Sequence, residues 1–295
     1  MSNRPRYLLC CSVLLLLQGM NIALWAEEPA QPAENLAEPA KPATPAGHST
    51  HGEAFNEGPR QQAKLIPGTG KVHFPITTKN PVAQQFFDQG VGQLHGFWYL
   101  EAERSFRQVA MLDSECAMAY WGMTRANAEN DKRAKEFIAK AVTLKDKVSE
   151  RERKYIAALD AYYKADAAKK KERGEAYVKA IEAIALAHPE DIEAKALLGL
   201  QIWLNRSNEI PITSYLPVDA LLKQVLAVEP LHPCQHYLIH LWDHEKAEMA
   251  LDAAAKCGPA APGIAHMWHM PGHIYSDLHR YSDAAWQQEA SARVA

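Results

Sequence analysis

The sequence predicts an all-α fold, a right-handed solenoid of about six helical hairpins stacked in order along the chain. Three observations support this prediction. Small residues recur with a period near 34 residues, the length of a two-helix repeat. Hydrophobic residues make up 47% of the 295 residues and charged residues 23%, which allows a sizeable core. Asn80-Pro81 supplies a helix N-cap and a proline at the first helical position, so it marks where the helices begin.

The first 26 residues predict a signal peptide. Arg4 and Arg6 precede the apolar run Tyr7 to Leu17, and Leu24-Trp25-Ala26 places a small residue at a suitable cleavage point. A retained membrane anchor is the alternative, but the apolar core is shorter than the roughly 20 residues that a bilayer span needs. We therefore expect a periplasmic or secreted protein without stable membrane insertion after cleavage.

Charge argues against nucleic acid as a partner. The whole chain has a net charge of -3, and loss of Arg4 and Arg6 would leave 30 basic residues against 35 acidic ones. Nonspecific binding to nucleic acid needs an excess of basic residues, so the sequence predicts none.

Residues 27–75 predict a disordered linker rich in Ala, Pro and Glu. Eight of the 18 prolines fall in it, and residues 27 to about 46 are almost only these three residue types. Such a stretch cannot bury enough apolar surface to fold. Lys71 to Ile76 are expected to add a short extended segment, and residues 76–295 to form the helical repeat domain.

The repeat positions match those of a tetratricopeptide unit. In the first repeat, positions 4, 8, 20 and 24 are taken by Phe86, Gly90, Ala102 and Phe106. In the last repeat, counted from Ala265, positions 4, 8, 11 and 20 are taken by Trp268, Gly272, Tyr275 and Ala284, and only Pro271 departs from the pattern. Glycine at position 8 facing alanine at position 20 lets two antiparallel helices pack closely. A generic helical bundle with Ala-rich interfaces is the alternative.

The six hairpins are expected to end without a cap. Their approximate spans are 81–115, 116–147, 149–189, 190–229, 232–258 and 263–295. Trp286, Ala290 and Val294 lie on a last helix that no further repeat covers, whereas solenoids need a polar cap. We expect this helix to present an apolar face to solvent, and the chain to be incomplete at its C-terminus or covered there by a partner.

Two histidine clusters supply candidate metal ligands. The first is His232, His236, His240 and His244, each four residues from the last, and the second is His266, His269 and His273. A spacing of four puts two imidazoles on one helix face, where they can chelate a divalent transition metal such as zinc. The clusters lie on first helices of consecutive repeats, so the pairs should face each other. The predicted metal ligands are His236, His240, His266, His269 and His273.

An alternative interpretation is that these histidines pack and form hydrogen bonds in a narrow groove, or contact a partner. No HExxH motif is present, so the zinc-protease arrangement with a built-in glutamate base is missing. Asp243 or Glu245 could act as a fourth ligand or as a base. We assign no catalytic residue, and an enzyme is less expected than a binding protein.

Four further residues take groove-facing positions in the repeats, and they would contact a bound ligand: His95, Trp121, Arg125 and Trp203. Aromatic residues with a cation suit an extended peptide or a planar ligand. Packing in the core would explain Trp121 and Trp203 equally well.

The mature cysteines are Cys116, Cys234 and Cys257, and no CxxC motif is present. Cys234 opens the first helix of the fifth hairpin and Cys257 closes the second, so they could form a disulfide that stabilises the fold by about 3 kcal/mol. Two separate buried thiols are the alternative, and the favoured one.

Four segments resemble a family of exported bacterial tetratricopeptide-repeat proteins, over about residues 71–295. They are Leu94-His-Gly-Phe-Trp-Tyr-Leu-Glu-Ala-Glu-Arg-Ser-Phe106, Cys116-Ala-Met-Ala-Tyr-Trp-Gly122, His236-Tyr-Leu-Ile-His240 and His269-Met-Pro-Gly-His273. The resemblance implies the fold and export, and all five predicted metal ligands match the family's His motifs. Some relatives are joined to a thioredoxin-like or peroxiredoxin-like domain that this sequence lacks, so redox activity is not expected.

Together these patterns predict a periplasmic scaffold that binds a protein segment or small ligand in its concave groove. The alternative is a transition-metal-binding protein, or a metal-dependent enzyme, that uses the facing HxxxH pairs.

Overall fold

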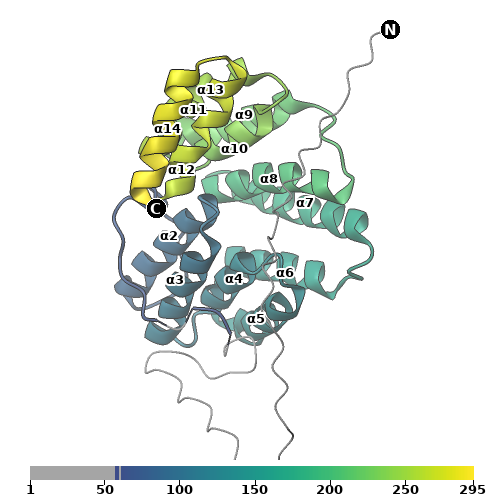
Figure 1. Cartoon of the computed structure of the whole chain (residues 1–295). Coiled ribbons are helices and arrows are strands. Elements are labelled where there is room, and N and C mark those ends of the chain that lie inside the picture. The colour runs from purple at the N-terminus through teal and green to yellow at the C-terminus, as the bar shows by residue number, and fades with distance from the viewer. Residues whose placement is uncertain (1–56, 60) are drawn as a thin grey trace, which may run out of the picture. The chain divides into compact units, whose positions relative to one another are not determined.

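The structure is a computed structural model and describes residues 57–59 and 61–295. The predicted signal peptide and residues 27–56 of the predicted linker lie outside the described residues. The described part of the chain is built from helices without a strand (Figure 1), so the all-α class is confirmed.

Consecutive helices pack on one another along the chain: α2 on α3, α4 on α5, α6 on α7, α8 on α9, α10 on α11, and both α12 and α13 on α14. The helices are α2 (Pro81–His95), α3 (Tyr99–Leu112), α4 (Ala117–Ala126), α5 (Asp131–Leu144), α6 (Glu150–Lys164), α7 (Lys170–Ala187), α8 (Ile192–Leu204), α9 (Tyr215–Val228), α10 (Gln235–Trp242), α11 (Leu251–Ala260), α12 (Ala265–His269), α13 (Pro271–Asp277) and α14 (Tyr281–Val294). Short 3-10 turns lie at Lys145–Lys147, Asn205–Asn208 and Ala247–Ala250.

The last predicted hairpin contains one helix more than expected. Its first helix is divided at Met270, with α12 ending at His269 and α13 beginning at Pro271. Proline has no amide hydrogen and therefore cannot donate the hydrogen bond that would carry the helix through this point. The departure from the repeat pattern at Pro271 thus has a structural consequence.

Capping side chains set the helix starts. The Asn80 side chain accepts hydrogen bonds from the backbone N–H groups of Val82 and Ala83, with Pro81 at the first helical position, so the predicted start of α2 is confirmed. Ser149 and Glu152 form a capping box at the start of α6.

Glycines bring the paired helices close together. A Cβ atom added to Gly90 of α2 would lie 2.6 Å from the Phe106 ring of α3, and one added to Gly199 of α8 would lie 2.6 Å from Leu222 of α9. The expected close approach is therefore present. At Gly90 the nearest atoms belong to Phe106 rather than Ala102, so an aromatic ring fills the space that the missing side chain leaves.

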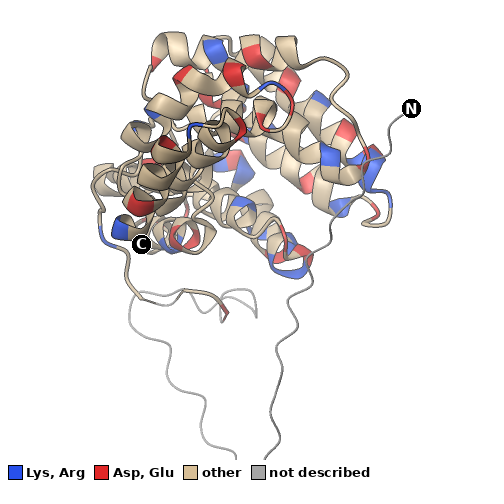
Figure 2. Cartoon of the chain, turned by 45° about the horizontal axis from the view of Figure 1, so that its top comes forward, with Lys and Arg blue, Asp and Glu red and all other residues tan. Residues whose placement is uncertain are grey.

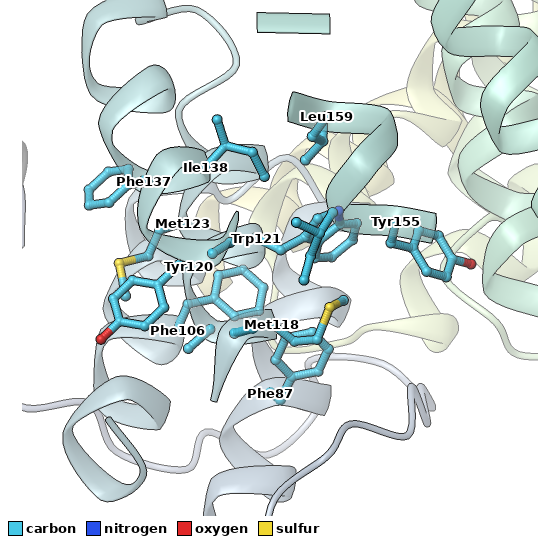
Figure 3. Packing of buried hydrophobic residues seen from close by; sticks show 14 of the residues in the cluster. Phe87, Phe106, Met118, Tyr120, Trp121, Met123, Phe137, Ile138, Tyr155 and Leu159 are labelled. Carbon is cyan, nitrogen blue, oxygen red and sulfur yellow. The ribbon is translucent and has the colours of Figure 1, made fainter. Parts of the chain in front are cut away.

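The N-terminal half is organised around an aromatic core. Trp121 is fully buried, with its ring centroid 5.6 Å from those of Phe74 and Tyr155 and 6.4 Å from that of Phe87. Figure 3 shows Trp121 among Phe87, Phe106 and Tyr155. Trp121 therefore does not line a ligand groove, and the alternative interpretation of packing in the core is confirmed. It lies where the helices α2, α3, α4 and α6 meet, and its large apolar ring is most stable out of water.

Part of the predicted linker packs against the helices. Phe74 is fully buried, and the backbone N–H of Ile66 donates to the Gln89 side chain at 2.6 Å. Gln84 and Asp88 of α2 also accept hydrogen bonds from the backbone N–H groups of Ile76 and Phe74. Residues 61–76 thus form an extended segment held by the polar side chains of α2.

The first and last hairpins contact each other. The backbone N–H of Gly263 donates to the carbonyl of Gly68 at 2.8 Å, and a Cβ atom on Gly96 would lie 2.7 Å from Ile264. Figure 1 shows α2 beside α12. In an open solenoid each repeat contacts only its neighbours. Here residues near α2 close against the segment that precedes α12, and this closure positions the site described below.

Helix α14 presents apolar side chains to solvent, as predicted. Trp286 is 56% exposed, and Tyr281 and Val294 are exposed as well, whereas Ala290 of the predicted face is half-buried and Ala284 is buried against the preceding helices. Basic and acidic residues are interspersed over the described helices (Figure 2). Among the described helices, none combines the length and apolar character that crossing a membrane requires.

The three cysteines in the described residues are free and buried. The possible disulfide between Cys234 and Cys257 is therefore absent, and the favoured interpretation of two separate buried thiols is confirmed. Burial, with a smaller contribution from Cys234, raises the pKa of the Cys257 thiol, which keeps it protonated.

Candidate metal centre

Three of the predicted ligands come together between α10 and α12. His236 and His240 lie one turn apart on α10, with ring centroids 4.5 Å apart, and His266 of α12 lies against His236 with its ring centroid 4.7 Å away. One ring nitrogen from each of the three lies within 4.8 Å of the other two. We call His236, His240 and His266 the candidate metal centre.

The nitrogen positions approach those of a metal site. The Nε2 atoms of His236 and His266 are 3.0 Å apart. Zinc–nitrogen bonds of 2.0–2.1 Å in tetrahedral geometry place two ligand nitrogens about 3.3 Å apart. Small side-chain adjustments would therefore bring these imidazoles onto one ion.

A hydrogen bond on the far edge of the His236 ring fixes which of its nitrogens faces the other two imidazoles. The Nδ1 atom of His236 lies 2.9 Å from the carbonyl oxygen of His95. A carbonyl only accepts, so Nδ1 carries the hydrogen and Nε2 keeps its lone pair for the centre. The Nε2 atom of His240 is buried and has no hydrogen-bond partner among the described residues. A buried nitrogen without a partner costs free energy, and a bound ion would remove that cost.

The environment keeps these imidazoles neutral. Burial, reinforced by the neighbouring imidazoles, holds the pKa of His236 well below its usual range and lowers the pKa of His240 to about 3 and that of His266 to about 4. A neutral imidazole offers the lone pair that a metal ion needs.

Phe97 covers the three imidazoles, and sequence reasoning did not single it out. Its ring stacks on His240 and His266 with centroids 5.5 and 5.6 Å away, and it packs edge-to-face with His236 with the centroids 4.5 Å apart. Its φ of +56° is a left-handed conformation that is unfavourable for a bulky residue. Such strain persists where surrounding contacts hold it, and it often marks a functional site.

A second imidazole pair, His269 and His273, adjoins the centre. Their Nε2 atoms are 3.1 Å apart. The Nδ1 atom of His269 lies 2.6 Å from the Gln288 amide oxygen, and that of His273 lies 3.3 Å from Asp243. Hydrogen-bonding to Asp243 raises the pKa of His273. Asp243, expected as a ligand or base, thus lies behind this pair, where it orients an imidazole.

The other members of the first cluster lie elsewhere. His232 precedes α10, which begins at Gln235, and His244 follows its end at Trp242, so neither continues the helical face. His244 is exposed, 3.3 Å from Asp277. Glu245, the other proposed fourth ligand, accepts a hydrogen bond from Tyr215 at 2.7 Å.

His95 and His232 form a buried triad with Glu193. Their Nε2 atoms lie 2.8 and 2.9 Å from the two carboxylate oxygens, while Tyr237 donates to Nδ1 of His95 and the backbone N–H of Cys234 donates to Nδ1 of His232. Both Nδ1 atoms accept, so both Nε2 atoms donate to Glu193. His95 is therefore a buried structural group, and the prediction that it contacts a groove ligand is wrong.

Trp203 and Arg125, the remaining predicted groove residues, lie at two different cavities. Trp203 packs on His240 with ring centroids 4.3 Å apart, and both line a cavity of about 350 Å³ with Asp243 and His244. Arg125 lines a separate cavity of about 530 Å³. Only the first of these borders the candidate metal centre.

Neither the protein-family models nor the curated proteins contain a match to this chain.

Proposed function

We propose that this protein binds a divalent transition-metal ion through His236, His240 and His266. The observation that carries the proposal is the convergence of three neutral imidazole nitrogens within 4.8 Å, one of them buried without a partner. Imidazole donors suit zinc, copper, nickel and iron, whereas magnesium and calcium prefer oxygen.

The donor set is that of an open site. Three protein ligands leave a coordination position on a tetrahedral ion for water or another molecule. The cavity lined by Trp203, His240 and Asp243 offers space beside the centre for such a ligand. Phe97 packs on all three imidazoles and would shield part of the bound ion from water. The imidazole pair His269 and His273 is proposed as a weaker, adjoining site.

We also propose that the helix pairs form a tetratricopeptide-type array and that the protein is exported. The consecutive pairing of helices and the close approaches at Gly90 and Gly199 support the first point. The resemblance of residues 71–295 and the N-terminal apolar run support the second.

A scaffold that binds a protein segment in its groove has weaker support than metal binding. Several of the groove-facing positions are occupied by imidazoles that contact one another and Phe97, and Trp121 lies in the core.

The test uses the mature protein without an affinity tag. We expect calorimetric titration with Zn²⁺ to give one tight site per chain, and Co²⁺ to give the absorption of a tetrahedral complex. Loss of a group that only supports a ligand weakens metal binding about 10–100-fold, so His240→Ala and His266→Ala should each weaken it by about 100-fold or more.

His279→Ala is the matched control, because His279 is exposed and, within residues 57–59 and 61–295, its ring pairs with Tyr281 alone. It should leave the affinity unchanged. Wild-type affinity in the double variant His240→Ala/His266→Ala, with its helical circular dichroism intact, would contradict the proposal. His269→Ala should affect only a second, weaker equivalent.

A further inference from the structure

A cavity of about 530 Å³ lies among α4, α6, α7, α8 and α10, apart from the candidate metal centre. Cavities of roughly 300–1,000 Å³ are the size that small organic ligands occupy. We call it the Arg125 cavity. Tyr99, Tyr162, Tyr163, Tyr177 and Tyr237 contribute to its wall, so it is both aromatic and able to form hydrogen bonds.

Arg125 lacks the partner that a partly buried guanidinium usually has. Its Nη1 atom donates a long hydrogen bond of 3.3 Å to the Tyr177 hydroxyl, and its Nε atom is shielded from solvent without a hydrogen-bond partner among the described residues. No ion pair joins it to a carboxylate in the described part of the chain.

Other shielded arginines in this protein are paired with carboxylates. Arg107 and Arg133 share Glu103, Arg151 pairs with Asp191, and Arg173 pairs with Asp131. Each of these shielded guanidinium groups therefore has its charge neutralised by an acidic side chain. Arg125 is different because no carboxylate in the described residues pairs with it and its side chain lines a cavity.

The tyrosines around Arg125 add donors without adding charge. Burial raises the pKa of Tyr99 to about 12 and raises that of Tyr177 as well, so their hydroxyls stay protonated. A protonated phenol can donate to an anion. At the rim, the exposed side chains of Glu129 and Lys170 offset each other, which leaves one uncompensated positive charge in the cavity.

We propose that the Arg125 cavity binds a small organic molecule that has one carboxylate and an aromatic or apolar body. The guanidinium fork matches a carboxylate in shape and charge, and the tyrosine rings match the body. A single cation favours a monoanion over a doubly charged phosphate. This site is independent of metal binding, so either proposal can fail while the other stands.

The first test compares benzoate with benzamide, which has nearly the same shape without the charge. Calorimetry on the mature wild-type protein should show one benzoate per chain and at least about 10-fold weaker binding of benzamide, because hydrogen bonds between charged groups stabilise a complex more than neutral ones. Arg125→Gln should weaken benzoate binding about 10-fold or more. Arg293→Gln, which removes the same charge from an exposed ion pair on α14, should leave it unchanged.

Equal affinity for benzoate and benzamide, unaltered binding in Arg125→Gln, or no binding of benzoate would each overturn the proposal. Inorganic phosphate that binds more tightly than benzoate would overturn the choice of a monoanionic organic ligand.

The second test needs no ligand and also checks folding. A guanidinium that serves to bind a ligand contributes little to the stability of the unliganded protein. Arg125→Met should therefore leave the thermal unfolding midpoint unchanged or raise it. Arg133→Met should lower the midpoint clearly, because it removes one of the two guanidinium partners of the buried Glu103 carboxylate. An equal fall in both variants would show that Arg125 is structural and would overturn the proposal.

Discussion

A histidine that faces a carboxylate and a histidine that faces another imidazole do different chemistry, and this chain places both kinds four residues apart. His232 donates to the Glu193 carboxylate, whereas His236 presents an unprotonated nitrogen to His266. The two residues are equivalent in the sequence pattern. Their chemistry follows from what α8 and α12 bring to them.

Among single substitutions, we expect one at Glu193 to lower the free energy of unfolding the most. Burial disfavours its charge, but the imidazoles of His232 and His95 more than offset burial and hold the pKa of its carboxyl below the ordinary 4.5. Glu193→Gln would replace an acceptor of two hydrogen bonds with a group that also donates. We predict a loss of about 3 kcal/mol or more in the free energy of unfolding, measured by urea denaturation at pH 7.

The same carboxyl predicts a pH dependence. Because its pKa is lower in the folded protein than in the unfolded chain, its contribution is present above pH 4.5 and is lost as the pH falls below that value. The difference between wild type and Glu193→Gln should shrink on acidification below about pH 4.5. Glu150→Gln, at an exposed site near the start of α6, is the control and should change nothing measurable. A difference that grows in acid would contradict this account.

At the scale of the helix, caps and breaks decide which histidines share a face. Helix α10 carries only His236 and His240, because it begins at Gln235 and ends at Trp242. In the last hairpin, Pro271 divides the first helix into two, so His269 ends α12 and His273 belongs to α13. Met270 between the two helices keeps helical φ and ψ, so His269 and His273 stay one turn apart and their rings meet.

Helix α14 should be the least stable helix among the described residues. Its exposed Tyr281, Trp286 and Val294 bury little apolar surface, although Gln288 and Ser291 hold it to α12 by hydrogen bonds. Elements with few buried contacts open most readily. We predict faster amide hydrogen exchange in residues 281–294 than in α4 and α8, or concentration-dependent self-association that protects α14.

Trp286→Gln separates these two outcomes, since it should abolish self-association without slowing exchange. A monomeric protein whose α14 amides are protected as strongly as those of α4 would show the prediction to be wrong.

For the molecule as a whole, closure of the first hairpin on the last two creates the site. Phe97 follows α2, yet its ring contacts His236, His240 and His266. A bound ion would tie α10 to α12 directly, and through Phe97 and His95 it would couple them to α2. Metal binding and global stability should therefore be linked.

We predict that Zn²⁺ at 100 times its dissociation constant stabilises the protein by about 2.7 kcal/mol, which corresponds to a rise of about 5–10 °C in the unfolding midpoint. Differential scanning calorimetry with and without a chelator measures the shift. His240→Ala should abolish it and His279→Ala should preserve it. An equal shift in all three proteins would mean that zinc acts elsewhere.

The sequence by itself determined the helical class, the start of the first helix and the histidine spacing. These features depend on residues close together in the chain, such as Asn80 with Pro81 and His236 with His240, and local backbone physics acts on them directly. The exposed face of α14 was also predictable, because no later repeat among the described residues packs against it.

Only the tertiary structure decided which histidines meet. The repeat register predicted that the two clusters face each other, but it did not select His266 as the third member of the centre. That selection, the buried partnership of His95 with Glu193 and the covering ring of Phe97 depend on packing between segments 30 to 170 residues apart. No local pattern marks such a contact, because its free energy comes from apolar burial and hydrogen bonds formed only after the helices have packed. For the same reason Trp121, which has the sequence pattern of a groove residue, lies in the core.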